Sequence, residues 1–259
     1  MFRLAIRIFP VALLWITVTA CGLDSVHPFS EEAYDATELA PVSTAGPATT
    51  EQIDLLTLAD KGESLVAMAS GPNVGVFRRP QGERFTSFRN PGPFDVPRVF
   101  LVEKVREDWL KVLLPVRPNG TTGWVRVRDV EIGANPYSIQ VDLSDKNLTV
   151  SRRDRIIAQA TVAVGKTSTP TPTGTFYTTV LVASDDPAGP YGPYAFGLSA
   201  YSDVLTEFAG GPGQIAIHGT NDPSALGQAV SFGCIRVENP LIQRLAGMLP
   251  LGTPVHITS

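Results

Sequence analysis

The chain has 259 residues, of which 43% are hydrophobic and 18% charged, which is typical of a globular protein rather than a disordered one. Its formal net charge is −4 and its basic residues are scattered, which argues against a nucleic-acid partner, because that needs clustered Lys and Arg. With 23 Gly, 22 Pro and few helical patterns, it is predicted to be a mainly β protein of one large domain or two small ones.

Residues 1–21, MFRLAIRIFPVALLWITVTAC, predict an export signal. Arg3 and Arg7 precede an apolar run over residues 8–18 that is short for a membrane-spanning helix. The closing VTAC resembles a bacterial lipobox, in which Cys21 is acylated and becomes the mature N-terminus; the alternative is an ordinary secretory signal. The lipobox interpretation predicts an exported protein, held by its lipid on a bacterial membrane and facing the cell wall or periplasm.

Residues 22–53 are polar, acidic and rich in Ser, Thr, Ala and Pro, which predicts a flexible tether between the lipid and the folded part. If Cys21 is removed or lipidated, Cys234 is the only thiol left in the mature chain. A lone thiol in an exported protein is either buried and inert or kept for its reactivity. We therefore expect Cys234 to carry chemistry.

Residues 54–133 contain short apolar runs separated by turns, and the PNG at 118–120 predicts a turn between two strands. The segment WLKVLLPVRPNGTTGWVRVRDV resembles the last strands of a bacterial SH3-like domain. That resemblance implies a small β-barrel that either binds the cell wall or only spaces the next domain from the membrane. Trp109 and Trp124 are expected in its core.

Residues 134–259 predict a second, β-rich domain. YSIQVDLSDKNLTVSRRDRIIAQATVAVGK predicts a three-stranded meander, and GQIAIHGT predicts a strand that ends at His218. DDPAGPYGPYAFGLSAY predicts a long loop over a site, in which Tyr191 and Tyr194 either line a cleft or pack the loop down. PLIQRLAGML predicts a short helix, and GTPVHITS a closing strand.

The segment HGTNDPSALGQAVSFGCIRV, residues 218–237, combines a histidine with this lone cysteine. A cysteine attacks carbonyls as the thiolate, so its pKa must fall from about 8.5, and histidine is the usual proton acceptor. Gly233 allows a close backbone approach, and N–H groups around Gly233 and Cys234 could form an oxyanion hole. The competing interpretation is a buried cysteine and a hydrogen-bonded core histidine at His218.

The other candidate ligands and acids are less favourable. Neither a metal nor a cofactor is predicted, because one Cys and two candidate His residues lack the spacing of a zinc site. His27 lies in the predicted tether, and His256 lies in the closing strand. Asp222 is the nearest acid that could orient an imidazole, but Pro223 follows it and favours a turn.

The same segment resembles the signature of the YkuD-type L,D-transpeptidases, which is His-Gly-Thr, a loop, and then Ser-X-Gly-Cys-Ile-Arg. TPTPTGTF and GTPVHI match that family as well, so the resemblance extends from residue 137 to the end. It implies a β-sandwich-like catalytic domain whose partners are peptidoglycan stem peptides, a tetrapeptide donor and an amine acceptor. Carbapenems, which resemble the donor, are expected to acylate the same cysteine.

The resemblance also implies residue roles. Cys234 would attack the carbonyl that precedes the terminal D-alanine, and an acceptor amine would resolve the acyl-enzyme to a 3→3 cross-link. His218 matches the general base, Gly219 lies beside it, and Ser231 matches a residue that helps to position the imidazole. Arg236 matches a basic position that suits a stem-peptide carboxylate.

One position departs from the family pattern: many members carry a second histidine directly before the Gly-Cys, where this chain has Phe232. His218 is then the only local base, and Phe232 is expected to affect acceptor contacts or rate. Three functions stay open at this point: an L,D-transpeptidase, an L,D-carboxypeptidase that transfers the acyl group to water, and a non-catalytic wall-binding lipoprotein.

Overall fold

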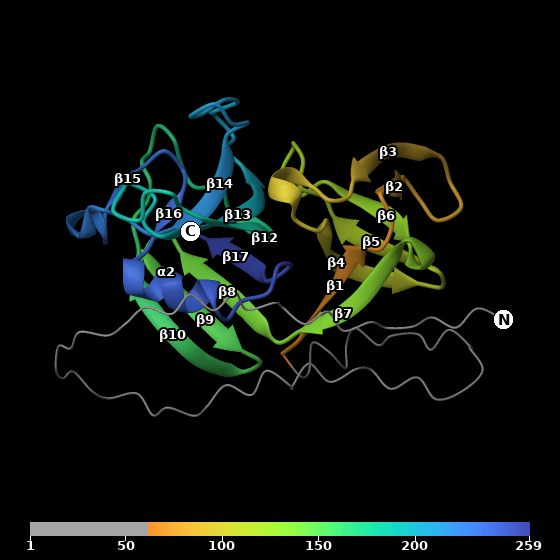
Figure 1. The fold of residues 1–259 in the computed structure, drawn as a ribbon, viewed down its shortest axis with the longest axis horizontal. Helices are drawn as coiled ribbons and strands as arrows, with labels where there is room; N and C mark the ends of the chain where they lie inside the picture. Colours follow the sequence, from red (N-terminus) through yellow and green to blue (C-terminus); the bar gives the residue numbers. More distant parts are fainter. Residues whose placement is uncertain (1–61) are drawn as a thin grey trace. The chain divides into compact units, whose positions relative to one another are not determined.

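The computed structural model describes residues 62–259, which are mainly β-strands with a single α-helix in that part of the chain (Figure 1). This confirms the predicted mainly β class. The predicted signal, Cys21, His27 and most of the tether lie outside the described residues. Within residues 62–259, no helix is both long enough and apolar enough to cross a membrane.

The first sheet has seven strands in the order β3-β2-β6-β5-β4-β1-β7, with every pair antiparallel. Its strands are β1 (Ser64–Ala69), β2 (Asn73–Phe77), β3 (Arg84–Arg89), β4 (Val99–Arg106), β5 (Trp109–Leu113), β6 (Thr122–Arg126) and β7 (Val130–Asn135). β3 was not predicted, because most of its side chains are exposed and no apolar period marks it. Trp109 is buried in this sheet as expected, whereas the SH3-like assignment stays a prediction.

The second sheet has eight strands in the order β10-β9-β8-β17-β12-β13-β14-β16. Its strands are β8 (Tyr137–Asp142), β9 (Asn147–Arg152), β10 (Arg155–Thr161), β12 (Gly174–Ala183), β13 (Tyr194–Tyr201), β14 (Gln214–His218), β16 (Ile235–Arg236) and β17 (Pro254–Thr258). β8 to β10 form the predicted meander. A small separate sheet pairs β11 (Val164–Gly165) with β15 (Ala229–Ser231), and helix α2 (Asn239–Ala246) buries Ile242 and Leu245 in the core.

The predicted long loop over residues 185–201 is wrong in its second half, which is strand β13. β13 is an inner strand, paired with β12 on one side and β14 on the other. Gly197 fits here because a Cβ atom would lie 2.7 Å from Val180 Cγ1. The strand is therefore selected by its two neighbours, which the local Gly and Pro content does not reveal.

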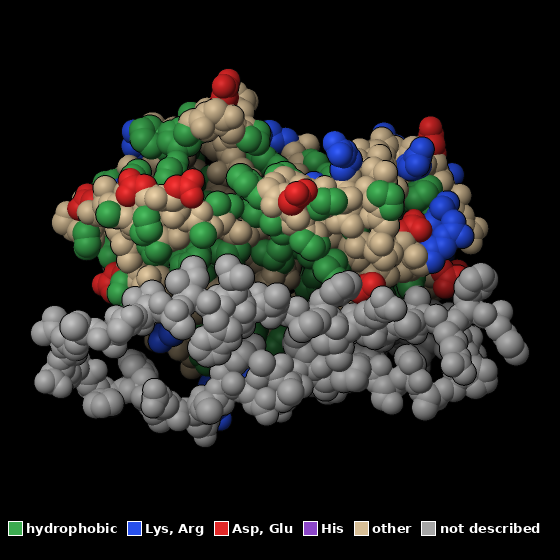
Figure 2. Space-filling model, viewed as in Figure 1, with side chains coloured by type: hydrophobic (Ala, Val, Ile, Leu, Met, Phe, Trp, Pro, Cys, Tyr) green, Lys and Arg blue, Asp and Glu red, His purple; other side chains and the backbone are tan. Residues whose placement is uncertain are grey.

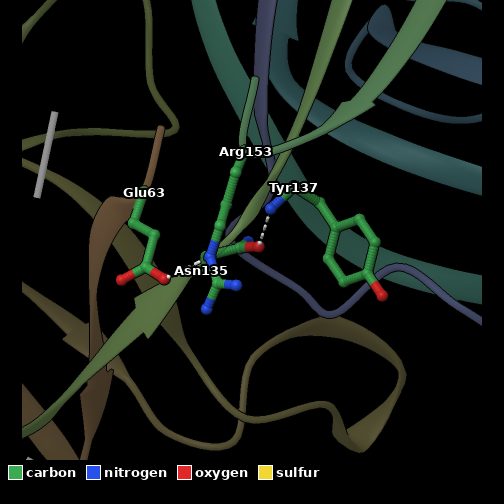
Figure 3. Close-up of polar contacts among 4 residues, drawn as sticks. All are labelled: Glu63, Asn135, Tyr137 and Arg153. Carbon is green, nitrogen blue, oxygen red and sulfur yellow. Dashed lines mark hydrogen bonds and ion pairs between the residues drawn. The ribbon is translucent and has the colours of Figure 1, made fainter. Parts of the chain in front are cut away.

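The chain passes from the first sheet to the second between β7 and β8, at Pro136. Figure 3 shows two contacts at this junction: the Asn135 side-chain oxygen accepts the Tyr137 N–H at 2.9 Å, and Arg153 pairs with Glu63 at 2.9 Å. Both contacts join residues of the first sheet's segment to the second. The predicted domain boundary at 133/134 lies close to this junction and stays a prediction.

The two sheets also share a hydrophobic cluster. Tyr177 of β12 is fully buried among Val99, Leu101 and Leu113 of the first sheet, and its hydroxyl donates to the Leu113 carbonyl at 3.2 Å. In Figure 2, the Lys and Arg side chains of the visible face form separate groups, mostly over the first sheet. No continuous basic stripe crosses this face.

Candidate active site

The predicted catalytic residues lie on two neighbouring strands at one end of the second sheet. β14 and β16 are parallel, and their register pairs Ile217 with Ile235 and His218 with Arg236. The two isoleucines are buried in the core, so alternation along the strands places His218 and Arg236 on the opposite face. Cys234 lies two residues before Arg236, on the same side. Residues that are 16 positions apart in sequence thus meet across a spacing of about 5 Å between strands.

The histidine is held in one tautomer by its own loop. His218 is only 3% exposed, and its Nδ1 lies 2.6 Å from the carbonyl oxygen of Gly219. A carbonyl oxygen can only accept, so Nδ1 carries the hydrogen and Nε2 keeps its lone pair. The ring of Tyr191 covers the imidazole, with 4.8 Å between ring centroids. The arrangement leaves Nε2 as the nitrogen that can accept a proton.

Both reacting groups are uncharged in this structure. Burial lowers the pKa of His218 to about 4, although the bond to Gly219 opposes the shift, and Arg236 lowers the pKa further. Burial raises the pKa of Cys234, although a backbone hydrogen bond with Ala216 and the charge of Arg236 oppose it. The lowered thiol pKa that the sequence argument required is therefore not found. At neutral pH the pair is a thiol and a neutral imidazole, so the proton must move during the attack.

A tight turn presents the half-buried Cys234. The Ser231 hydroxyl donates to the Cys234 carbonyl at 2.6 Å and accepts the Gly233 N–H at 3.1 Å. Gly233 has φ +118°, a region that disfavours side chains, and a Cβ there would lie 2.8 Å from Ile215 Cδ1. Ser231 and Gly233 thus shape the turn.

Two sequence-based roles are affected by this turn. The hydrogen bond found at the imidazole comes from Gly219, and the predicted role of Ser231 toward that ring stays a prediction. The Gly233 N–H already donates to Ser231, so it could serve an oxyanion only by exchanging that bond. The Cys234 N–H is then the stronger candidate for the predicted oxyanion hole.

Two threonines missed by the sequence analysis support the turn from the opposite strand connection. Thr169 Oγ1 donates to the Ser231 carbonyl at 3.0 Å, and Thr171 Oγ1 donates to the Gly233 carbonyl at 2.8 Å. Thr171 Oγ1 also accepts the Gly165 N–H at 2.9 Å. Both threonines lie in the TPTPTG stretch, whose match to the family was the only available signal, since each bond spans 62 residues of sequence.

Replacing Thr171 by valine is expected to lower the free energy of unfolding by about 1–3 kcal/mol, because two buried backbone groups lose their partner without any change in side-chain shape. The matched control is Thr171→Ser, which keeps the hydroxyl and should be closer to the wild type. Urea unfolding measures the difference. Equal stability of the valine and serine variants would show that these bonds do not hold the turn.

Asn239, at the start of α2, was also missed. Its Oδ1 accepts the Thr220 N–H at 2.8 Å. A Cβ on Gly219 would lie 2.2 Å from this oxygen, and one on Gly192 would lie 2.3 Å from it. Both glycines are therefore required for the close packing of helix α2, the end of β14 and the loop that carries Tyr191.

The structure separates the two tyrosines. Tyr191 is 41% exposed and contacts His218, and its pKa is raised by burial and by the nearby Cys234. Tyr194 starts β13, packs partly buried against the core of the second sheet, and accepts the Gly219 N–H through its carbonyl at 3.3 Å. Only Tyr191 is brought to the reacting pair; a substrate role for either tyrosine stays a prediction.

Arg236 and Phe232 flank the cysteine. The Nε atom of Arg236 is buried, and no hydrogen-bond partner is found for it within residues 62–259. Its guanidinium is therefore available to a carboxylate. Phe232 is 45% exposed, with Lys166 Nζ 4.4 Å from its ring centroid and the Phe208 ring centroid at 5.2 Å. A phenyl ring cannot carry a proton, so His218 is the base that this arrangement offers.

The remaining candidates lie outside this arrangement. Asp222 lies in a turn, where its N–H donates to Thr220 Oγ1 at 3.0 Å. His256 lies in β17, with its Nδ1 3.1 Å from Thr175 Oγ1. Among the described residues, no group of three or more His, Cys, Asp or Glu is placed to hold a metal ion.

A thiol and a neutral imidazole on adjacent strands, beside a guanidinium, form an arrangement suited to acyl transfer through a cysteine. Residues 136–257 match the family model described as the L,D-transpeptidase catalytic domain, YkuD. "Putative L,D-transpeptidase YqjB" of Bacillus subtilis (strain 168) is 33% identical over 135 residues, which cover 48% of this chain and 72% of that protein. The chain therefore belongs to the YkuD-type L,D-transpeptidase family.

A second relative, "Putative L,D-transpeptidase YkuD" of Bacillus subtilis (strain 168), is 40% identical over 122 residues. That match covers 47% of this chain and 66% of the relative, so the chain spans slightly less than two thirds of the relative's length. Among solved structures, Bd1075 of Bdellovibrio bacteriovorus matches with 27% identity and a TM-score of 0.39, over 48% of each chain. The family assignment depends on the sequence matches.

Proposed function

We propose that the chain is a peptidoglycan L,D-transpeptidase that forms 3→3 cross-links through an acyl-enzyme on Cys234. The observation that supports this most is the parallel register of β14 and β16, which brings the Nδ1-protonated imidazole of His218 beside the presented thiol. Tetrapeptide stems are the donor class, and a side-chain amine of a second stem is the acceptor. No cofactor is required by this chemistry.

The proposed reaction has two halves. Cys234 Sγ attacks the carbonyl before the terminal D-alanine while Nε2 of His218 takes the thiol proton, and the protonated imidazole returns that proton to the leaving amine of D-alanine. The acceptor amine then attacks the thioester carbonyl and gives a proton to His218. The C–S bond breaks, and the sulfur regains its proton. Arg236 would bind a stem carboxylate, and Tyr191 would cover the donor.

Carbapenems are proposed as covalent inhibitors for the same chemical reason. Their strained lactam carbonyl would accept the sulfur in place of the D-alanyl carbonyl, and ring opening would leave the acyl group attached to Cys234. The attached group lacks a departing amine, so the adduct should persist.

The cellular setting is proposed from the sequence. Cys21 would carry the lipid that holds the protein on a bacterial membrane, and residues 22–53 would span the distance to the folded part. Residues 54–133 would form the SH3-like module, and residues 134–259 the catalytic domain that faces the cell wall.

The test uses the purified chain with a disaccharide-tetrapeptide, followed by mass spectrometry of the products. Dimers that have lost one D-alanine are the expected result. Tripeptide monomer alone would mean that water is the acceptor and that the chain is an L,D-carboxypeptidase. No turnover would favour the non-catalytic wall-binding lipoprotein.

A further inference from the structure

The connection between β13 and β14, residues 202–213, is fastened to the first sheet by one arginine. We call it the 202–213 loop. Arg117 lies in the β5–β6 connection (Figure 1). Its Nη1 donates to the Pro212 carbonyl at 2.8 Å, and its Nη2 donates to the carbonyls of Leu205 at 2.8 Å and Ser202 at 3.1 Å. A single guanidinium thus joins both ends of the loop.

Neighbouring contacts strengthen this attachment. Asn119 accepts the Tyr201 N–H at 2.9 Å and donates to the Tyr201 carbonyl at 2.7 Å, as a further strand would. The Arg117 guanidinium lies over the Tyr201 ring, 4.8 Å from its centroid. Gly213 has φ +69°, and a Cβ there would lie 2.1 Å from the Leu205 carbonyl oxygen. The base of the loop is therefore closely packed against the first sheet's connection.

The tip of the loop reaches the site. The backbones of Phe208 and Gly211 exchange two hydrogen bonds, each 2.9 Å long, around a tight turn. The Phe208 ring then packs against Phe232, with 5.2 Å between centroids and 32° between planes. Phe232 lies two residues before Cys234. A continuous set of contacts consequently leads from Arg117 to the residue beside the nucleophile.

From this set we infer that Arg117 is a positioning residue for the acceptor side of the site. It holds the 202–213 loop so that Phe208 fixes Phe232 as an apolar wall beside Cys234. The wall excludes water from the acyl-enzyme and leaves the approach of the acceptor amine open. The acceptor part of this inference depends on the proposed transpeptidase function, whereas the mechanical part does not.

The test compares Arg117→Ala, Arg117→Lys and Phe208→Ala in the full chain, with Arg128→Ala as the matched control. The Arg128 side chain is 73% exposed in the same sheet's segment, and its nearest acid is 3.8 Å away. Cleavage after the exposed Glu207 by a glutamate-specific protease reports on loop attachment. It should accelerate roughly fivefold in Arg117→Ala, less in Arg117→Lys, and not in Arg128→Ala.

Two further readouts report on the site. Arg117→Ala and Phe208→Ala should both raise the ratio of tripeptide to cross-linked dimer and the KM for the acceptor by roughly fivefold, with carbapenem acylation within about twofold of wild type. Both should also accelerate iodoacetamide alkylation of Cys234, because the wall no longer covers it. A general loss of folding would instead lower acylation and cross-linking together.

The outcomes separate the two proposals. Unchanged cleavage at Glu207 in Arg117→Ala would overturn the attachment, and faster cleavage with unchanged product ratio and alkylation would overturn the positioning role. If the wild type forms no product, the transpeptidase proposal fails by itself. Alkylation of Cys234 then decides the mechanical part: faster alkylation in both variants supports it, and equal rates overturn it.

Discussion

Replacing Cys234 by alanine is expected to abolish covalent acylation by a carbapenem and to reduce turnover of the tetrapeptide by at least about 10⁴-fold. The reason is that the sulfur forms the bond to the acyl group, and no other thiol is present among the described residues. Intact-protein mass spectrometry, with and without the carbapenem, measures the adduct directly. The same variant in the product assay measures turnover.

Two further variants make this test specific. Cys234→Ser keeps a nucleophilic atom on the turn but a far less acidic one, so it should react much more slowly than wild type. Val230→Ala removes a side chain that is 39% exposed near the same turn and should react at a rate close to wild type. An adduct of equal yield on the alanine variant would disprove Cys234 as the nucleophile.

Replacing His218 by glutamine is expected to lower kcat/KM by about 10²–10⁴-fold, because the attack loses its proton acceptor. The matched control is His256→Gln, which removes the histidine of β17 and should change the rate by less than about twofold. Steady-state rates at neutral pH distinguish the two variants. Equal losses in both would mean that His218 has no special role.

The pH dependence gives an independent check of the same base. Burial lowers the pKa of His218 to about 4. The imidazole is therefore the free base at any pH well above 4, and protonation removes it only below that value. We expect kcat/KM to rise with pH through about 4 and to be level near neutrality, whereas an ordinary histidine pKa of 6.5 would place the rise there. A midpoint near 6.5 would contradict the buried, neutral imidazole.

Patterns that are local in sequence were predicted well. The meander of β8 to β10 follows from alternating apolar residues, and the strand that ends at His218 follows from GQIAIH. The predicted helix begins one residue earlier than expected, at Asn239, and ends at Ala246, where Gly247 follows. These elements are selected by side-chain periodicity and by Gly and Pro, which act within a few residues.

The sequence by itself determined the family, the candidate nucleophile and base, and the departure at Phe232, because all of these are carried by one short segment. Only the tertiary structure decided what surrounds them. The Gly219 carbonyl at the imidazole, the threonine bonds that span 62 residues, and the attachment of the 202–213 loop by Arg117 all arise between distant segments. The protonation states belong to the same class, since burial sets the pKa of both Cys234 and His218, and burial exists only once the two sheets have folded.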